Sequence, residues 1–182
     1  MRVHQKYFSI TDKENNLESK FLFVANSVKN KNRDFRVIEG NERVLKARLS
    51  DASYFFENDI SNTFENWNEK LKHVLFYESL GSLHDKTIRM ANISKKFAKA
   101  FGVKPELAKQ AAFLSKADLV SEMVMEFPEL QGIMGGHYAK IKNKSEEVSK
   151  AIFEHYKPKG GADDLPETKL GFLLSLVDKV DT

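Results

Sequence analysis

We infer the fold of this chain from one segment, PELAKQAAFLSKADLVSEMVMEFPELQGIMGGHY, residues 105–138. Taken as a helix from Leu107 to about Phe127, it carries apolar residues on nearly every side. Its two opposite apolar faces contain Leu107, Ala111, Leu114 and Met125 on one side, and Ala112, Phe113, Val120 and Met123 on the other. A helix that is apolar all round must be buried by neighbours on several sides, so the segment predicts the centre of a helical bundle.

Two ionisable residues, Lys116 and Asp118, lie inside this apolar segment. Burying a charge is unfavourable unless the charge is paired, so we expect both residues to have partners in the fold. The step from Phe127 to Pro128 predicts the end of the helix, because the residue before a proline is pushed out of the α region. A glycine-rich stretch follows at residues 132–136, where the backbone can turn sharply or approach another group closely.

Composition and charge exclude several classes of protein. With 41% hydrophobic and 30% charged residues the sequence is typical of a globular protein, and 182 residues suffice for one sizeable core. No apolar run is long enough to cross a bilayer. The absence of cysteine excludes disulfides and thiolate metal sites, and it fits a reducing cytoplasm. The net charge of +3 argues for a nucleic-acid partner only where basic residues cluster.

The first 40 residues predict a small antiparallel β structure. Residues 1–10 and 19–28 are rich in aromatic and β-branched residues, and the polar sequence TDKENNLE separates them. This pattern is typical of two antiparallel strands joined by a turn. Residues 29–36, KNKNRDFR, predict a polar, basic connector. Because a lone hairpin is only marginally stable in water, we interpret residues 1–40 as the remnant of a preceding domain.

From Asn41 the apolar residues recur at helical spacing, which predicts a helical domain over residues 41–182. Asn41 is a good N-cap for the first helix. Further helices are predicted from about Thr63 to Leu75 with Gly81 as the stop, over residues 82–102, from the N-cap Ser145, and from near Pro166 to the end. The last helix breaks off in mid-pattern at DKVDT, so we expect the domain to be truncated there. The predicted fold class is mainly α, and α+β overall.

One helix, residues 82–102, has a basic face. Its apolar arc includes Met90, Ile93 and Phe97, and Gly102 lies where the helix should end. The basic face carries Arg89, Lys95, Lys96 and Lys99. Such a face is either merely solvated or contacts a phosphate backbone, and the residues themselves leave both interpretations open.

The residues that could carry chemistry offer one near-match to a known pattern. None of the five histidines forms a close pair with metal-ligand spacing. The pair His84-Asp85 on an amphipathic helix, followed by a central helix and a late helix with Asp178, resembles the layout of the HD phosphohydrolases. In that family the His-Asp pair belongs on the central helix, where this chain reads LSKADL.

A lysine at that position changes the chemistry. The Lys116 ammonium opposes the binding of a divalent ion electrostatically. It can instead form a salt bridge to a carboxylate, for which the candidates are Asp118, Glu122, Asp178 and Asp181. The sequence therefore predicts a catalytically inactive helical scaffold with no metal.

Several stretches together resemble the β subunit of the bacterial two-subunit glycyl-tRNA synthetase. They are MRVHQKYF, GNERVLKARLSDASYFFENDI, EKLKHVLFYESLGSL, LSKADLVSEMVMEFPELQGIMG and ADDLPETKLGFLLSLVDKVDT. The resemblance implies a middle piece of that subunit with an HD-like helical fold. It implies a separate α subunit as partner, which holds the glycine and ATP site with its magnesium, and tRNA as the other partner. It implies a cytoplasmic protein with neither membrane nor DNA as a partner, and no cofactor in this piece.

The basic residues and the HD-like pattern give two sets of candidate site residues, and we expect no catalytic residue in this piece. The candidates for tRNA binding are Arg89, Lys95, Lys96, Lys99, Arg43 and Lys46. The scaffold positions of the degenerate HD-like site are His84, Lys116, Asp118, Asp178 and Asp181. A second basic surface is formed by Arg36, Arg43, Lys46 and Arg48, although one helix face cannot present all of them.

The leading hypothesis is a non-catalytic module of glycine–tRNA ligase that supports tRNA binding and glycyl-tRNA formation. One alternative is an active metal-dependent phosphohydrolase that uses His84, Asp85, Asp118 and Asp178. Another is a purely structural domain that braces neighbouring subunits.

Overall fold

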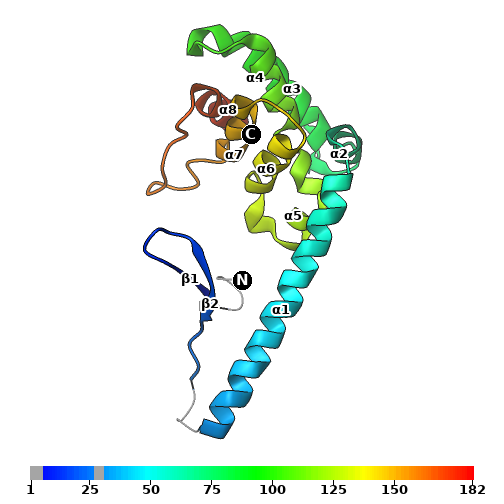
Figure 1. Cartoon of the computed structure of the whole chain (residues 1–182). Helices are drawn as coiled ribbons and strands as arrows, with labels where there is room; N and C mark the ends of the chain where they lie inside the picture. Colours follow the sequence, from blue (N-terminus) through cyan, green and yellow to red (C-terminus); the bar gives the residue numbers. More distant parts are fainter. Residues whose placement is uncertain (1–5, 27–30) are drawn as a thin grey trace. The chain divides into compact units, whose positions relative to one another are not determined.

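The computed structural model describes residues 6–26 and 31–182, which form a mainly helical protein with a small antiparallel hairpin (Figure 1). The predicted fold class is confirmed. The chain divides into two compact units, residues 1–47 and 48–182. The predicted division after residue 40 falls inside one long helix, α1 (Lys31–Ser61). Residues 1–5 of the predicted first strand, which include His4, and residues 29–30 of the predicted connector lie outside the described residues.

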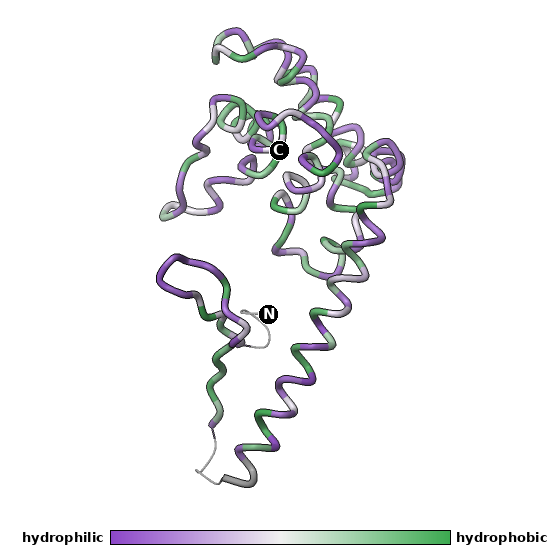
Figure 2. The backbone as a smooth tube through the Cα atoms, viewed as in Figure 1, coloured by the Kyte–Doolittle hydropathy of each residue, from purple (hydrophilic) through white to green (hydrophobic). Residues whose placement is uncertain are grey.

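The predicted hairpin consists of β1 (Phe8–Thr11) and β2 (Leu17–Leu22), paired antiparallel. Asp12 organises the turn, because its Oδ1 accepts hydrogen bonds from two backbone amides further along the turn. Figure 2 colours this turn as hydrophilic. Within the first unit, the Tyr7 hydroxyl donates a hydrogen bond of 2.6 Å to Asn41 Oδ1 on α1. The hairpin therefore has a polar contact with the helix that follows it.

The predicted start of the first helix is wrong. Residues 31–36 are helical rather than a connector, and Asn41 lies inside α1 instead of capping it. The Asn41 side-chain amide donates to the carbonyl of Val37, one turn earlier. Neither a proline nor a second glycine interrupts residues 31–41, so the favourable helix propensities of arginine and glutamate outweigh the single Gly40.

The second unit contains the rest of α1 and a series of shorter elements. These are α2 (Phe64–Leu71), β3 (Leu75–Tyr77), β4 (Gly81–Ser82), α3 (Leu83–Phe97), η1 (Ala98–Phe101), α4 (Pro105–Leu114), η2 (Ala117–Val120), α5 (Glu122–Glu126), η3 (Pro128–Leu130), α6 (Ile133–Ile141), α7 (Glu146–Glu154) and α8 (Lys169–Val180). Several predicted signals are confirmed. Gly102 is left-handed directly after η1, Pro105 opens α4, and the Ser145 hydroxyl caps α7.

The helix predicted from Thr63 to Leu75 ends at Leu71 instead, and the chain continues into a two-stranded ribbon of β3 and β4. Gly81 belongs to that ribbon with φ of 81°. The next residue, Ser82, forms a capping box with Asp85 that starts α3. Gly81 was predicted to end the preceding helix. It lies instead directly before α3, because the capping box at Ser82 starts that helix.

The predicted central helix is not continuous. It breaks after Leu114, passes through η2, and resumes as α5, which the Ser121 hydroxyl caps. In between, the Asp118 carboxylate accepts hydrogen bonds from the backbone amides of Gly132 and Gly135. Local propensity favours one long helix here, but these contacts to a distant segment override it. The expected burial is confirmed for Ala111, Ala112, Leu114 and Met123, whereas Met125, which the sequence placed on an apolar face, is 70% exposed.

The core of the second unit is built around Trp67 and Tyr138, whose ring centroids lie 5.1 Å apart. The Tyr138 hydroxyl donates to Asp59 Oδ2 at 2.7 Å. The same Asp59 carboxylate accepts the amides of Glu122 and Met123, and it thereby joins α1 to the start of α5. Within the described ranges, no helix is both long and apolar enough to span a bilayer.

Candidate functional site

The buried charge of Lys116 is the centre of the candidate site. Lys116 follows the last turn of α4, and only 3% of the residue is exposed. Its ammonium donates to Asp178 Oδ2 at 2.8 Å and lies 3.0 Å from His155 Nε2. The ammonium also lies 3.9 Å from the centroid of the Tyr156 ring. Of the four carboxylates considered from the sequence, Asp178 is therefore the one that pairs with it.

The hydrogen bonds of His155 fix which ring nitrogen carries the proton. Nδ1 lies 2.6 Å from the carbonyl of Ile152, so Nδ1 donates, and Nε2 accepts from Lys116. Burial, and then the Lys116 charge, lower the pKa of His155 to about 3. Burial also lowers the pKa of Lys116 to about 8, against the opposing effect of Asp178. At neutral pH the site thus holds a neutral imidazole beside a charged lysine.

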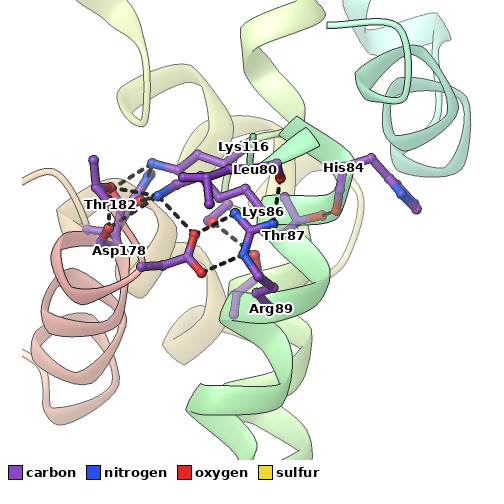
Figure 3. Close-up of polar contacts among 12 residues, drawn as sticks. Leu80, His84, Lys86, Thr87, Arg89, Lys116, Asp178 and Thr182 are labelled. Carbon is purple, nitrogen blue, oxygen red and sulfur yellow. Dashed lines mark hydrogen bonds and ion pairs between the residues drawn. The ribbon is translucent and has the colours of Figure 1, made fainter. Parts of the chain in front are cut away.

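A second buried lysine, Lys86 on α3, completes the charge cluster (Figure 3). Its ammonium lies 3.2 Å from Asp178 Oδ1 and 3.5 Å from Asp181 Oδ2, and it donates to the Thr182 hydroxyl at 2.8 Å. Sequence reasoning missed this residue. The available signal was its position one turn before Met90 on the apolar arc of α3, where a lysine requires a buried partner.

Arg89 joins the cluster from the next turn of α3. Its Nε and Nη2 donate to the two oxygens of Asp181 at 2.8 and 3.0 Å, and its Nη1 donates to the carbonyl of Leu80 (Figure 3). The hydrogen bond to Asp181 is the main reason that the pKa of Arg89 is raised. This guanidinium, expected from the sequence on a tRNA-binding face, is engaged in holding α8 against α3.

Asp118 has a different role from the one that an HD-type site would give it. Its Oδ2 accepts the amides of Gly132 at 2.6 Å and Gly135 at 2.9 Å, so it anchors the start of α6. Burial raises the pKa of this carboxyl to about 6, although both amide hydrogen bonds act in the opposite direction. The expected close approach of the glycine-rich stretch is confirmed, because a Cβ on Gly135 would lie 2.9 Å from this carboxylate.

The residues at this position do not fit a divalent cation. His155 and Asp178 have the chemistry of metal ligands, but the Lys116 ammonium binds both of them. Within the described residues, no three histidine, aspartate or glutamate side chains gather in a way that could hold a metal ion. The close contacts that a cation would need are therefore taken by the lysine.

His84 and Asp85 lie apart from the charge cluster. Figure 3 shows the His84 side chain pointing away from it, and the His84 ring packs 6.0 Å from the ring of Phe113. The Asp85 carboxylate accepts from the amide and the hydroxyl of Ser82 in the capping box. The structure thus brings together Lys116, Asp178 and Asp181 of the predicted scaffold, and leaves His84 outside.

Known proteins match this chain over its whole length. A family model described as glycyl-tRNA synthetase beta subunit matches residues 1–182. This chain belongs to that family. It is 44% identical to the glycine–tRNA ligase beta subunit of Marinobacter nauticus and 46% identical to that of Hahella chejuensis, over all 182 residues. It is 47% identical to the protein of that name from Sulfurihydrogenibium over 180 residues. The chain spans about a quarter, 26%, of the length of each of these relatives.

Charge patterning in the sequence gave six basic residues as candidates for tRNA binding, and the structure distinguishes among those on α3 and η1. Lys95 forms an exposed ion pair of 2.6 Å with Glu106. Lys96 and Lys99 are exposed, and no described residue forms an ion pair with either. Two further lysines, Lys104 and Lys169, are exposed as well. The Lys169 ammonium lies 3.6 Å from where a Cβ on Gly102 would be, so the turn at Gly102 brings it next to η1.

We give the name lysine surface to four exposed lysines at the end of α3, in η1, before α4 and at the start of α8, namely Lys96, Lys99, Lys104 and Lys169. Sequence reasoning missed the last two, because neither lies on the helix whose periodicity marked the basic face. The other two candidates lie on α1 in the first unit. Arg43 is 3.6 Å from Glu39 and exposed, and Lys46 is exposed. Arg48, which belongs to the second basic surface predicted from the sequence, forms an ion pair with Glu126 at 2.8 Å.

Proposed function

We propose that this chain is a non-catalytic part of a glycine–tRNA ligase beta subunit, which supports tRNA binding and through it the formation of glycyl-tRNA in the cytoplasm. The family membership supports a role in the formation of glycyl-tRNA. The position of the Lys116 ammonium between His155 and Asp178 supports the absence of catalysis, because it neutralises the site that has the chemistry of an HD-type centre. The fold is, in this proposal, a degenerate HD-like bundle held by salt bridges.

In the same proposal the catalytic residues lie on a separate α subunit, as the family resemblance implies. That subunit would bind glycine, ATP and magnesium. The described residues of this chain would contribute surface rather than chemistry. Its rigid core, with the charge cluster joining α3, α4, α7 and α8, is suited to presenting a surface in a fixed position.

The lysine surface is the feature that favours tRNA contact. Lys96, Lys99 and Lys104 are close in sequence, and Lys169 lies next to Gly102, between the last two. All four are exposed, and no described residue forms an ion pair with any of them. Ammonium groups that are not paired within the protein are available to phosphates. Such contacts release counterions, so the affinity should fall steeply as salt is raised.

The test is to change all four lysines of the lysine surface to glutamine in the complete ligase and to measure the KM for tRNA at several salt concentrations. We expect the KM to rise and the slope of log affinity against log salt to fall by about one unit for each phosphate that is no longer neutralised. Lys70 and Lys140, exposed lysines on α2 and α6, provide the matched control when changed to glutamine. An unchanged KM in the fourfold variant would remove the lysine surface from the proposal.

A purely structural role is the second candidate, and one observation favours it. Phe172, Leu176 and Val180 are exposed apolar residues spaced four apart on α8, so they share one face of that helix. Exposed apolar rows are typical of protein–protein contacts. If the chain only braces its neighbours, Leu176→Ser should reduce co-purification of the α subunit while the glutamine variants of the lysine surface leave the KM for tRNA unaltered.

A further inference from the structure

Two aromatic rings meet beside the lysine surface, one from η1 and one from α8. The ring centroids of Phe101 and Phe172 lie 6.1 Å apart, with an angle of 36° between the ring planes. Phe172 is 42% exposed, and Phe101 is half-buried. Single apolar residues on a surface are ordinary, but rings that meet from distant parts of the sequence form a patch. We call Phe101 and Phe172 the aromatic pair.

Lysines lie next to both members of the aromatic pair. Lys169 is one turn before Phe172 on α8, and residues three apart on a helix are neighbours on its surface. The Lys169 ammonium lies 3.6 Å from where a Cβ on Gly102 would be, and Gly102 directly follows Phe101. Lys99 precedes Phe101 within η1. Cations therefore flank the aromatic pair on both of its elements.

The nearby carboxylates leave these cations unpaired. Glu106, at the start of α4, forms its ion pair with Lys95 at 2.6 Å. Glu167, just before α8, is exposed, and no ion pair joins it to Lys169 in the described part of the chain. An apolar face of a protein partner would cover the rings but bring no charge for the lysines. A nucleic acid brings both, because phosphates alternate along it with flat bases.

The aromatic pair also indicates which form of RNA fits. Within a duplex each base is stacked between its neighbours, so the duplex offers a protein its backbone and its grooves. Bases in single-stranded loops, bulges and ends can be splayed out and stacked on aromatic side chains. Such stacking tolerates any sequence, because every base has a flat face. Lysines beside exposed rings are therefore suited to a single strand.

We propose that the aromatic pair is a stacking platform for an unpaired base of the tRNA, and that Lys99 and Lys169 bind the adjoining phosphates. The proposal rests on the proposed function and deepens it, because it names an unpaired segment as the part of the tRNA that this surface takes. The segment is selected by being unpaired rather than by its sequence. Phe172 also begins the apolar row of α8, so a contact with the α subunit at this patch is the competing outcome.

Salt separates stacking from phosphate contacts. Phe172→Leu in the complete ligase keeps an apolar side chain and removes the flat ring. We expect it to raise the KM for tRNA by about fivefold, near the lower end for one base–aromatic stack, and by the same factor at every salt concentration. The glutamine variant of the lysine surface should change the salt slope instead. An unchanged KM in Phe172→Leu beside a raised KM in the glutamine variant would overturn the platform and leave the proposed function standing.

Oligonucleotides test whether the base must be unpaired. Labelled oligouridylate, alone or annealed to oligoadenylate, is titrated with the full chain and with its Phe172→Leu variant, and the affinities are measured by fluorescence anisotropy. We expect the variant to lose about fivefold in affinity for the single strand and nothing for the duplex. Equal losses for both RNAs, or no binding of the single strand by the unaltered chain, would overturn the proposal.

Matched variants separate the ring from general effects. Phe172→Trp keeps an aromatic face and should retain the KM of the unaltered ligase. Phe153 on α7 is 43% exposed, and its ring lies 6.4 Å from that of His137. Phe153→Leu removes an equally exposed ring and should leave the KM unchanged. If Phe172→Leu reduces co-purification of the α subunit but not the affinity for oligouridylate, the patch is a protein contact and the proposal fails.

Discussion

The ammonium of Lys116 lies 2.8 Å from the carboxylate of Asp178, 62 residues further along the chain, and both groups are largely out of solvent. Removing one member of a buried pair takes from the other charge its closest compensation, and Asp178 would keep only Lys86 at 3.2 Å. We therefore expect Lys116→Met and Asp178→Asn each to lower the free energy of unfolding by about 3 kcal/mol. The double variant should lose less than the sum of the two, because it removes both charges of the pair and leaves Lys86 with Asp181. Urea denaturation of the four proteins measures this.

The exposed pair of Lys72 and Glu69, at 2.7 Å, is the control for the buried pair. Both partners are solvated, so Lys72→Met should leave the unfolding midpoint unchanged within error. Additive losses in the Lys116 and Asp178 cycle would show that the two residues do not depend on each other, against the geometry of the site.

The pKa values of His155 and Asp118 predict opposite pH effects on stability. The pKa of His155 is lowered from 6.5 to about 3 in the folded chain, so its contribution is present above pH 6.5 and is lost as pH falls towards 3. The pKa of Asp118 is raised from 3.8 to about 6, so its contribution is present below pH 3.8 and is lost as pH rises through 6. At 1.36 kcal/mol per pKa unit, the two effects are about 5 and about 3 kcal/mol.

Between pH 6.5 and 3 the stability lost through His155 should therefore be partly offset by Asp118. The Lys116 charge lowers the pKa of Asp178 against the effect of burial, so Asp178 adds to the loss in acid. His155→Gln should make the loss of stability on acidification smaller than in the wild type. Urea midpoints measured across this pH range test both statements. A His155→Gln chain that loses stability in acid as the wild type does would contradict the neutral, buried imidazole.

Asp118 offers a sharper comparison of charge against hydrogen bonding. The same oxygen, Oδ2, accepts both the Gly132 and Gly135 amides, and an asparagine carbonyl oxygen can do the same. Asp118→Asn should thus keep α6 in place at neutral pH and remove the stabilisation that protonation of Asp118 brings in acid. Asp118→Ala leaves two buried amides without acceptors and should cost about 2–4 kcal/mol. Equal melting temperatures for the two variants at pH 7 would exclude this anchoring role.

Gly135 and Gly40, both inside helices, should respond in opposite directions to alanine. A Cβ on Gly135 would lie 2.9 Å from Asp118 Oδ2 and 3.0 Å from a methyl carbon of Ile152, and the backbone amides hold the carboxylate in place. Gly135→Ala should therefore cost about 1–3 kcal/mol through overpacking. Nothing lies within 4 Å of a Cβ on Gly40, so Gly40→Ala should stabilise α1 by about 1 kcal/mol. Circular dichroism melts of the two variants give both signs.

Local signals in the sequence predicted the elements whose ends are determined locally. The Ser145 cap, Pro105 at the start of α4 and the left-handed Gly102 all concern residues within one turn of the boundary that they mark. The break in the central helix was not predictable in this way. LSKADL favours a helix, and only the amides of the glycine-rich stretch, 14 and 17 residues after Asp118, make the interruption favourable.

The candidate site was predictable only where a charged residue occurs in an otherwise apolar segment, because such a residue requires a partner of opposite charge. A lysine within an apolar helix requires a partner, and this reasoning placed Asp178 among four candidates for Lys116. It could not supply His155, because nothing near a histidine in sequence shows a contact 39 residues away. The same reasoning applied to the apolar arc of α3 would have found Lys86 as well.

Arg89 on α3 and Lys99 on η1 belong to the same predicted basic face, yet the structure predicts that they act on different properties of the ligase. Arg89 is bound to both oxygens of Asp181 and to the carbonyl of Leu80, whereas Lys99 is exposed and has no ion pair in the part of the chain that the structure describes. Arg89→Ala should lower the free energy of unfolding by about 2 kcal/mol, as expected for the removal of hydrogen bonds to a charged group, and leave the KM for tRNA unchanged. Lys99→Gln should leave the melting temperature unchanged and raise the KM, more at low salt than at high salt, because screening weakens the phosphate contact in both proteins. Melting curves and tRNA kinetics on the same two variants test the pair. A raised KM in a fully folded Arg89→Ala protein would place the guanidinium on the tRNA after all, and would require that Asp181 releases it when RNA binds.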